Sequence, residues 1–233
     1  GSPVVAGDLV IFNTGTGTAL ARKTGKTVWK HDGLPGLATP VLFAHRGNPA
    51  VAIFCGDQLI ARALADGKLL WKIPWKTNLA VNACDPVFVD KDSKVFVCSD
   101  YGLGRALYDI SGDEPRELWK LTQGGDGHAY SSGFYHSGKL YAFVRDFARI
   151  DVADGARAQR ISGSGSALVL GETLVLLNGS GGLRIGKLSD DGFDETINTR
   201  ISSRGTPNVP AFASGHLFVR NEDGDIVCLK IGR

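Results

Sequence analysis

One arrangement of residues recurs three times in this sequence and limits the folds open to it. Three proline tripeptides each precede a stretch rich in β-branched and aromatic residues: Ser2-Pro3-Val4, Thr39-Pro40-Val41 and Asp85-Pro86-Val87. Each stretch ends at a tryptophan, and these tryptophans, Trp29, Trp71 and Trp119, lie 42 and 48 residues apart. A period of about 40 to 50 residues is typical of repeated units of four short strands.

Within each copy, short apolar runs alternate with turn residues, which predicts strands and tight hairpins. The glycine of the first hairpin recurs at Gly7, Gly138, Gly171 and Gly215, where it can supply the positive φ of a tight turn. No sustained helical period is present. A four-stranded sheet with two apolar faces cannot bury both alone, so such sheets stack around an axis. The sequence therefore predicts an all-β chain, a β-propeller of four-stranded antiparallel blades.

We count about six blades in a single domain and expect them to belong to a ring of six to eight. The predicted blades span residues 1–36, 37–79, 80–125, 126–163, 164–202 and 203–233. The last copy ends after what reads as a third strand, and no spare strand precedes the first copy. We therefore expect upstream sequence to supply a missing strand, and further blades with it.

The turn before each tryptophan is the most specific element of the repeat. Residues 19–29 read Ala-Leu-Ala-Arg-Lys-Thr-Gly-Lys-Thr-Val-Trp, and residues 61–71 read Ala-Arg-Ala-Leu-Ala-Asp-Gly-Lys-Leu-Leu-Trp. This pattern resembles the repeat of pyrroloquinoline-quinone-type β-propellers, over nearly the whole chain. The predicted structural anchors are Gly25, Trp29, Gly67, Trp71 and Trp119. The third copy departs from the pattern by an insertion at residues 111–119, and the fourth and fifth copies lack the tryptophan.

Dehydrogenases of the quinoprotein family, which the repeats resemble, hold pyrroloquinoline quinone and calcium in the central funnel, often beside two adjacent cysteines. This chain has no adjacent cysteine pair, and no calcium-ligand set of that family can be matched to it residue by residue. Serine-hydrolase elbows, P-loops and zinc-protease motifs are also absent from the sequence. We therefore predict no catalytic residues, no metal ligands and no cofactor. A dehydrogenase fragment using pyrroloquinoline quinone and calcium is the alternative.

Composition limits the partners. The chain has 26 basic and 24 acidic residues, a net charge of +2, which gives no basic footprint for nucleic acid. No apolar run approaches the roughly 20 residues of a membrane helix. Cys55, Cys84, Cys98 and Cys228 show no metal-binding spacing, and we interpret them as small buried apolar residues.

The candidate ligand-binding site follows from propeller topology. Loops that join the fourth strand of one blade to the first strand of the next meet at one mouth of the central channel. The candidates there are Asn82, Asp85, His128, Tyr130, Arg204 and Asn208. Asp85, His128, Tyr130 and Arg204 form the preferred constellation, because they offer charge, a titratable ring, an aromatic face and a hydrogen-bond fork.

The leading hypothesis is a non-catalytic binding or scaffolding propeller, a monomer that binds a protein or small molecule at the channel mouth. It is similar to quinone-repeat proteins that keep the blades without the cofactor, such as the outer-membrane assembly lipoproteins of Gram-negative bacteria. That resemblance implies an exported, periplasmic bacterial protein. A second alternative is a carbohydrate- or peptide-binding sensor domain, which an exposed aromatic patch around Trp75 and Tyr130 would support.

Overall fold

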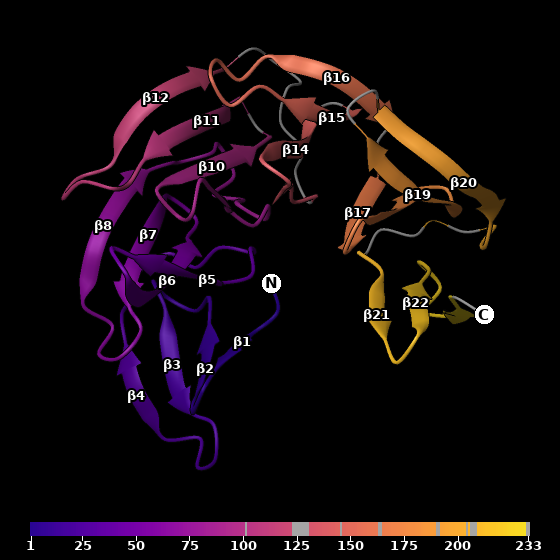
Figure 1. The fold of residues 1–233 in the computed structure, drawn as a ribbon. Helices are drawn as coiled ribbons and strands as arrows, with labels where there is room; N and C mark the ends of the chain where they lie inside the picture. Colours follow the sequence, from indigo (N-terminus) through magenta and orange to yellow (C-terminus); the bar gives the residue numbers. More distant parts are fainter. Residues whose placement is uncertain are drawn as a thin grey trace. The chain divides into compact units, whose positions relative to one another are not determined.

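The computed structural model consists of β-strands joined by turns and loops (Figure 1). The structure describes residues 1–100, 102–122, 131–144, 146–162, 165–189, 192–203, 205 and 209–231. Strands follow one another along the chain as antiparallel neighbours, and no helix occurs in these ranges.

Contacts within the chain divide it into two compact units, Gly1–Val144 with Ile150–Ala156, and Arg145–Arg149 with Arg157–Arg233. Three complete sheets belong to the first unit. The first sheet contains β1 (Val4–Ala6), β2 (Leu9–Phe12), β3 (Thr18–Ala21) and β4 (Thr27–Lys30). The second contains β5 (Val41–His45), β6 (Asn48–Phe54), β7 (Gln58–Ala63) and β8 (Leu69–Pro74). The third contains β9 (Val87–Val89), β10 (Lys94–Ser99), β11 (Gly104–Asp109) and β12 (Arg116–Leu121).

The boundary between the units passes through the fourth sheet. That sheet contains β13 (Phe134–His136), β14 (Lys139–Val144), β15 (Asp146–Ile150) and β16 (Arg157–Ser162). The fifth contains β17 (Gly165–Leu170), β18 (Thr173–Asn178), β19 (Gly182–Ser189) and β20 (Gly192–Arg200). The last has three strands within the described residues, β21 (Ala211–Ala213), β22 (His216–Arg220) and β23 (Ile226–Lys230).

These sheets are β-propeller blades, so the predicted fold class is confirmed. The predicted hairpin glycines also behave as expected. In the β13–β14 turn, Ser137 has a φ of 49° and Gly138 one of 76°, and Ser214 and Gly215 repeat this pair with 49° and 75°. Two successive positive φ values define the type I′ turn whose twist suits a two-residue hairpin.

A β-bulge recurs at one position of the blade. The register between the third and fourth strands shifts directly after the residue that pairs with each repeat tryptophan. The pairs concerned are Ala19 with Trp29, Ala61 with Trp71 and Leu107 with Trp119. In the fifth sheet the same shift follows the pair Ile185–Ile197, so Ile197 occupies the tryptophan position there. Bulges increase the local twist of a strand pair.

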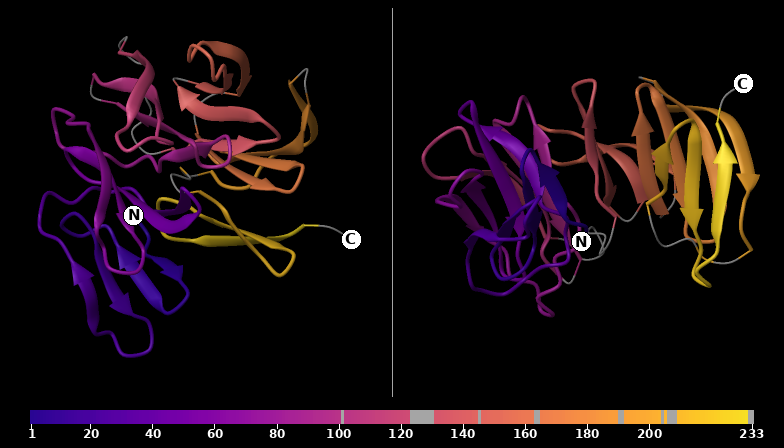
Figure 2. Two further views of the ribbon diagram at one scale, coloured as in Figure 1. Left: turned by 60° about the vertical axis from the view of Figure 1, so that its left-hand side comes forward. Right: turned by 90° about the horizontal axis from the view of Figure 1, so that it is seen from below.

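Alternate residues of β6 show how the blades of the first unit stack. Val51 and Ile53 pack in one cluster with Ile11 and Trp29 of the first sheet. Ala52 and Phe54 face the other way, into a cluster that includes Val95 of the third sheet. Side chains of a strand alternate between its two faces, so the second sheet is covered on both faces. Figure 2 gives two further views of these sheets, drawn in indigo and purple.

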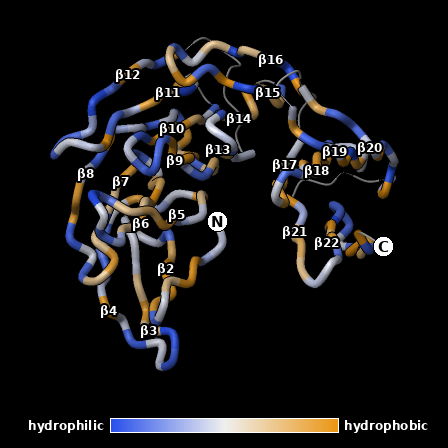
Figure 3. Tube along the Cα trace, viewed as in Figure 1, coloured by the Kyte–Doolittle hydropathy of each residue, from blue (hydrophilic) through white to orange (hydrophobic). Residues whose placement is uncertain are grey.

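The second unit has its own core between its last two sheets. Val175 and Leu177 of β18 pack with Leu217 and Val219 of β22. The opposite face of the last sheet is exposed at Phe218, Ile226 and Cys228. The interpretation of all four cysteines as buried apolar residues is therefore wrong for Cys228. Figure 3 shows apolar segments recurring along the strands, whereas the turn between β3 and β4 is hydrophilic.

Candidate functional site

Two of the six predicted channel-mouth residues lie within the described part of the chain. Asn82 and Asp85 both lie in the connection between β8 and β9. His128, Tyr130, Arg204 and Asn208 lie outside the described residues. The six-residue site therefore stays a prediction, and the two described members can be judged by what they contact.

Asp85 binds the loops on either side of its own. Its Oδ1 atom accepts a hydrogen bond of 2.7 Å from the main-chain N–H of Thr39, and its own N–H donates to Ser132 Oγ at 2.7 Å. Burial disfavours the charged carboxylate and raises the pKa of Asp85, although hydrogen bonds from Thr39 and Ser132 act in the opposite direction. Asp85 thus joins three successive inter-blade loops.

These contacts continue a repeated pattern. The N–H of Ser2 donates to Thr39 Oγ1 at 3.2 Å, just as Thr39 donates to Asp85 and Asp85 donates to Ser132. Each of the four residues lies two positions before the first strand of its blade, and we call the three bonds the inter-loop hydrogen bonds. They connect the first four blades at the end where the predicted mouth lies.

Asn82 is fully buried, and like Asp85 it forms hydrogen bonds with other parts of the chain. Its Nδ2 donates to the carbonyls of Cys55, at 2.8 Å, and Trp75, at 3.0 Å. The main-chain carbonyl of Asn82 accepts hydrogen bonds from the N–H groups of Leu37 and Ala38. These contacts hold the connection between the first and second blades against the connection between the second and third blades.

Trp75 does not contribute to an exposed aromatic patch. Its side chain is 1% exposed, directly follows β8 and packs against Phe54. The indole N–H donates to Ser99 Oγ at 2.7 Å, and the Lys120 ammonium lies 4.7 Å from the ring centroid. Trp75 therefore does not form the exposed aromatic patch that would support the carbohydrate- or peptide-binding alternative, and Tyr130 lies outside the described residues.

Two of the predicted anchors lock one blade to the turn of the next. The Trp29 indole N–H donates to the carbonyl of Leu64 at 3.1 Å, and a Cβ on Gly67 would lie 2.7 Å from the Trp29 ring. Trp119 repeats this arrangement with the carbonyl of Val152, at 2.8 Å, and with Gly155. The ring therefore lies against a glycine that has no room for a side chain. We call this contact the tryptophan lock.

The junction between the second and third blades lacks this lock. Trp71 is 4% exposed, and its indole N–H has no hydrogen-bond partner among the described residues. The corresponding turn of the third blade carries the insertion. Arg46, in the β5–β6 turn, holds that insertion through the carbonyl of Ser111 at 3.0 Å and an ion pair with Asp113 at 2.7 Å.

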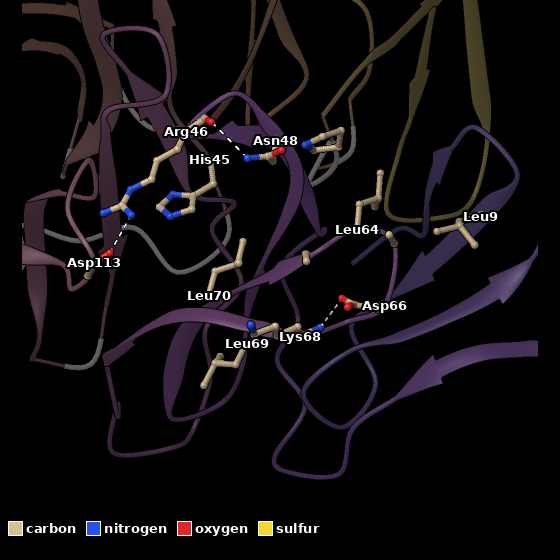
Figure 4. Close-up of a pocket in the computed structure, with 13 residues that line it drawn as sticks. Leu9, His45, Arg46, Asn48, Leu64, Asp66, Lys68, Leu69, Leu70 and Asp113 are labelled. Carbon is tan, nitrogen blue, oxygen red and sulfur yellow. Dashed lines mark hydrogen bonds and ion pairs between the residues drawn. The ribbon is translucent and has the colours of Figure 1, made fainter.

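A groove opens at this junction. It comprises a cavity of about 720 Å³ and a second of about 380 Å³, which share Leu69, Leu70 and Asp113 in their walls. We call the two cavities together the turn groove. The first is formed mainly by the turns of the second blade, with His45, Arg46, Leu64 and Lys68 among its walls, and by Leu9 of the first blade (Figure 4). The second is formed by β8 and the inserted loop, with Trp71, Lys72, Glu114 and Pro115.

The turn groove lies at the opposite end of the blade from the predicted mouth. The β5–β6 and β7–β8 turns share one end of the antiparallel sheet, and the β8–β9 connection leaves from the other. Sequence reasoning therefore missed this feature. The signal available was the insertion at residues 111–119, but its contact with Arg46 joins positions 65 and 67 residues apart.

The groove combines apolar walls with a few charged groups. The pKa of His45 is lowered by burial and by the neighbouring Arg46 charge, while Asp113 acts in the opposite direction. The Asp66 carboxylate accepts a hydrogen bond from the main-chain N–H of Lys68 at 3.0 Å. This arrangement offers apolar contact and hydrogen bonding, and no pair of groups in it is placed as nucleophile and base.

The described ranges lack two features. No group of three or more His, Cys, Asp or Glu side chains there could hold a metal ion. No helix suited to crossing a membrane was found in them either.

Comparison with known proteins identifies one matching family and two similar structures. The profile of a family described as outer membrane protein assembly factor BamB matches residues 1–161. The crystal structure of BamB from Moraxella catarrhalis superposes with a TM-score of 0.69 at 13% identity, covering 98% of this chain and 72% of that one. The computationally designed Ika8 protein gives 0.70 at 12% identity, covering 98% and 70%.

No curated protein matches the sequence. At these identities the two structures establish the fold alone, and the family profile carries the assignment. The resemblance to pyrroloquinoline-quinone-type propellers is confirmed, because the matching profile covers more than half of the chain. The chain belongs to the outer membrane protein assembly factor BamB family of β-propellers.

Proposed function

We propose that this chain is a non-catalytic scaffold that binds an extended segment of a protein during the assembly of outer-membrane proteins. The family description supports the process, and the turn groove supports the mode of binding. Export to the periplasm and a monomeric state belong to the same proposal. Cell fractionation of the tagged protein tests the first, and sedimentation tests the second.

The observation that carries the proposal concerns Trp71, which lines the groove and whose buried indole N–H has no hydrogen-bond partner among the described residues. At the neighbouring junctions, a carbonyl of the next turn accepts the equivalent hydrogen bond. A buried donor without an acceptor costs about 1–3 kcal/mol, so a ligand that displaces the side chains covering this N–H and supplies a carbonyl gains that energy. Every residue of an extended peptide offers one.

The strand beside the groove favours the same occupant. β8 is the last strand in the order of its sheet, and it contributes Leu69, Leu70, Trp71 and Lys72 to the groove. A sheet edge presents main-chain groups to which an extended peptide can add as a further strand. Leu69 and Leu70 then supply apolar contact for alternate side chains of that peptide.

Binding to an unfolded substrate tests the proposal. A fluorescently labelled outer-membrane β-barrel protein, unfolded in urea, is diluted into increasing concentrations of the chain, and anisotropy is recorded. We expect Leu69→Glu to weaken binding at least about tenfold, because it places a charge on the apolar wall. Val28→Glu is the matched control: Val28 is 47% exposed and Leu69 44%, and both lie on fourth strands close to a repeat tryptophan.

Equal affinity of the two variants would show that the groove is not the binding surface, whereas no binding by the unmodified chain would remove the scaffold function itself. The predicted mouth is tested in the same assay. Replacing Asp85 by Asn keeps a hydrogen-bond acceptor for Thr39 and removes the charge. We expect this variant to bind like the unmodified chain.

The enzyme alternative has its own test. Pyrroloquinoline quinone and calcium are titrated together while thermal unfolding is followed. A ligand at about 100 times its dissociation constant stabilises the folded state by about 2.7 kcal/mol, and we expect no such shift. A saturable rise in the unfolding temperature would favour the quinone-dependent oxidoreductase.

A further inference from the structure

Main-chain hydrogen bonds identify the residue that takes the tryptophan position in the fourth blade. In the first two blades, the turn between the third and fourth strands is closed by a hydrogen bond to the carbonyl of a lysine, and the tryptophan follows that lysine by three residues. In the fourth blade, the N–H of Asp151 donates to the carbonyl of Ala156, so Gln159 is the equivalent residue. The fourth blade therefore has a glutamine where the first three blades have an indole.

Gln159 lies against the fifth blade, just as a repeat tryptophan lies against the blade that follows it. A Cβ on Gly192, the first residue of β20, would lie 3.2 Å from Gln159 Nε2. In the two tryptophan locks, the equivalent distances to the indole ring are 2.7 and 2.6 Å. Because an amide side chain is much smaller than an indole, the junction between the fourth and fifth blades keeps space that the ring fills in the locks.

A cavity of about 520 Å³ has Gln159 in its wall. β15 contributes Asp146 and Ala148 to the walls, and β16 contributes residues 157–160. We call it the arginine cavity, because two of these residues, Arg157 and Arg160, are arginines. All of its walls belong to the second unit, whereas the walls of the turn groove belong to the first.

The arginine cavity carries an excess of positive charge. Arg160 Nε donates to Asp146 Oδ2 at 2.8 Å, and 69% of the Arg160 side chain remains exposed. The terminal N–H groups of Arg160 and the whole guanidinium of Arg157 have no hydrogen-bond or ion-pair partner among the described residues. A guanidinium group binds a carboxylate through paired N–H donors. Two arginines against one carboxylate therefore leave donors that suit an anionic ligand.

The strand in the wall of the cavity favours an extended peptide as that ligand. β16 is the last strand in the order of its sheet, and Arg157, Ala158 and Arg160 on it are exposed. The outer side of such a strand presents main-chain N–H and C=O groups that can pair with an added strand. A peptide can use these groups together with the arginines, whereas a phosphate or a lipid headgroup can use only the arginines. Every second side chain of the added strand would face the cavity.

We propose that the arginine cavity binds an extended acidic segment of a protein partner, whose carboxylates pair with Arg157 and Arg160 while its main chain lies along β16. This site is distinct from the turn groove, which offers apolar walls. Both lie at a junction without the tryptophan lock: an insertion replaces the lock between the second and third blades, and Gln159 replaces it between the fourth and fifth. The two surfaces therefore select segments of different composition.

Binding of a fluorescently labelled peptide to the full chain tests this proposal by anisotropy. The probe alternates glutamate and valine over about ten residues, and the matched peptide carries glutamine in place of glutamate. We expect the glutamine peptide to bind at least about tenfold more weakly, and added salt to weaken binding of the acidic peptide. The double variant Arg157→Gln, Arg160→Gln should lose at least about tenfold in affinity for the acidic peptide. Arg200→Gln, which removes an exposed arginine from β20 of the same unit, should lose none.

Asp146→Asn provides a variant whose effect has the opposite sign. It removes the carboxylate that pairs with Arg160, so we expect the acidic peptide to bind about two to five times more tightly. A variant that merely failed to fold would lose binding, so this gain separates the role of the charge from damage to the blade. Unchanged or weaker binding by Asp146→Asn would contradict the pairing of the peptide with Arg160.

Three results would overturn the proposal. The first is equal affinity of the double variant and Arg200→Gln for the acidic peptide, and the second is equal binding of the two peptides. The third is binding to phosphatidylglycerol vesicles, lost in the double variant, in the absence of peptide binding, which would assign the arginines to a lipid surface. Leu69→Glu should leave the affinity for the acidic peptide unchanged, so a failure of the turn groove and a failure of the arginine cavity can be told apart.

Discussion

Replacing Gly67 by alanine tests the tryptophan lock directly. Gly67 has a φ of 71°, a conformation that costs an L-residue about 1–2 kcal/mol. Its new Cβ would lie 2.7 Å from Cδ2 and 2.8 Å from Cγ of Trp29, so the ring must move. Overpacking of this kind costs about 1–3 kcal/mol. We expect Gly67→Ala to lower the free energy of unfolding by about 2–5 kcal/mol, from the sum of the two effects.

The first blade provides the control. Gly25 occupies the same turn position with a φ of 68°, and a Cβ there meets no described atom within 4 Å. Gly25→Ala should therefore show the backbone cost alone, about 1–2 kcal/mol. Both variants are unfolded in urea and followed by circular dichroism, since the linear dependence on urea yields the free energy. Losses that agree within about 0.5 kcal/mol would refute the reasoning about the ring.

Three further predictions use the same assay or a simple extension of it. Trp29→Phe should cost about 1–3 kcal/mol more than Trp71→Phe beyond the loss of packing, because only the former leaves a bonded carbonyl without its donor; equal losses would contradict the lock. The raised pKa of Asp85 means that the folded chain binds this proton more tightly than the unfolded chain does. Burying the charged carboxylate therefore lowers the stability at neutral pH. This cost is relieved as the pH falls through the folded pKa toward about 4. Asp85→Asn should therefore be the more stable form at pH 7, with the difference vanishing near pH 4, and urea unfolding at several pH values measures it. Arg46→Ala should change the free energy of unfolding by at most about 1 kcal/mol, since the ion pair with Asp113 is exposed, yet it should speed tryptic cleavage of the inserted loop; unchanged cleavage would show that Arg46 does not hold the loop.

The blade architecture could be predicted because its determinants are local. The positive φ of Gly138 and Gly215 follows from hairpin chemistry, and the position of Trp29 follows from the turn that precedes it. A repeated unit also needs only its neighbour to bury its faces, so the stacking follows once the repeat is recognised. The lost tryptophan of the fifth blade could be recognised in the same way, although its replacement by Ile197 becomes clear only from the strand register.

The candidate site was harder to predict because it depends on contacts between blades. Asp85 and Asn82 were correctly placed in an inter-blade connection, but the sequence does not reveal that their side chains bind neighbouring loops. The turn groove depends on how Arg46 holds an insertion in another blade.

The inter-loop hydrogen bonds have a consequence for how the chain tolerates substitution. In each of the three bonds the donor is a main-chain N–H and the acceptor is a side-chain oxygen of the following blade. An exchange at Thr39 or Asp85 therefore deprives only the preceding blade of its acceptor and leaves the bond to the following blade intact. The loss of the hydrogen bond is confined to a single junction, the one with the preceding blade on the amino-terminal side. Only proline, which lacks the N–H, would interrupt both directions at once, so each blade can vary its side chains almost independently of the others.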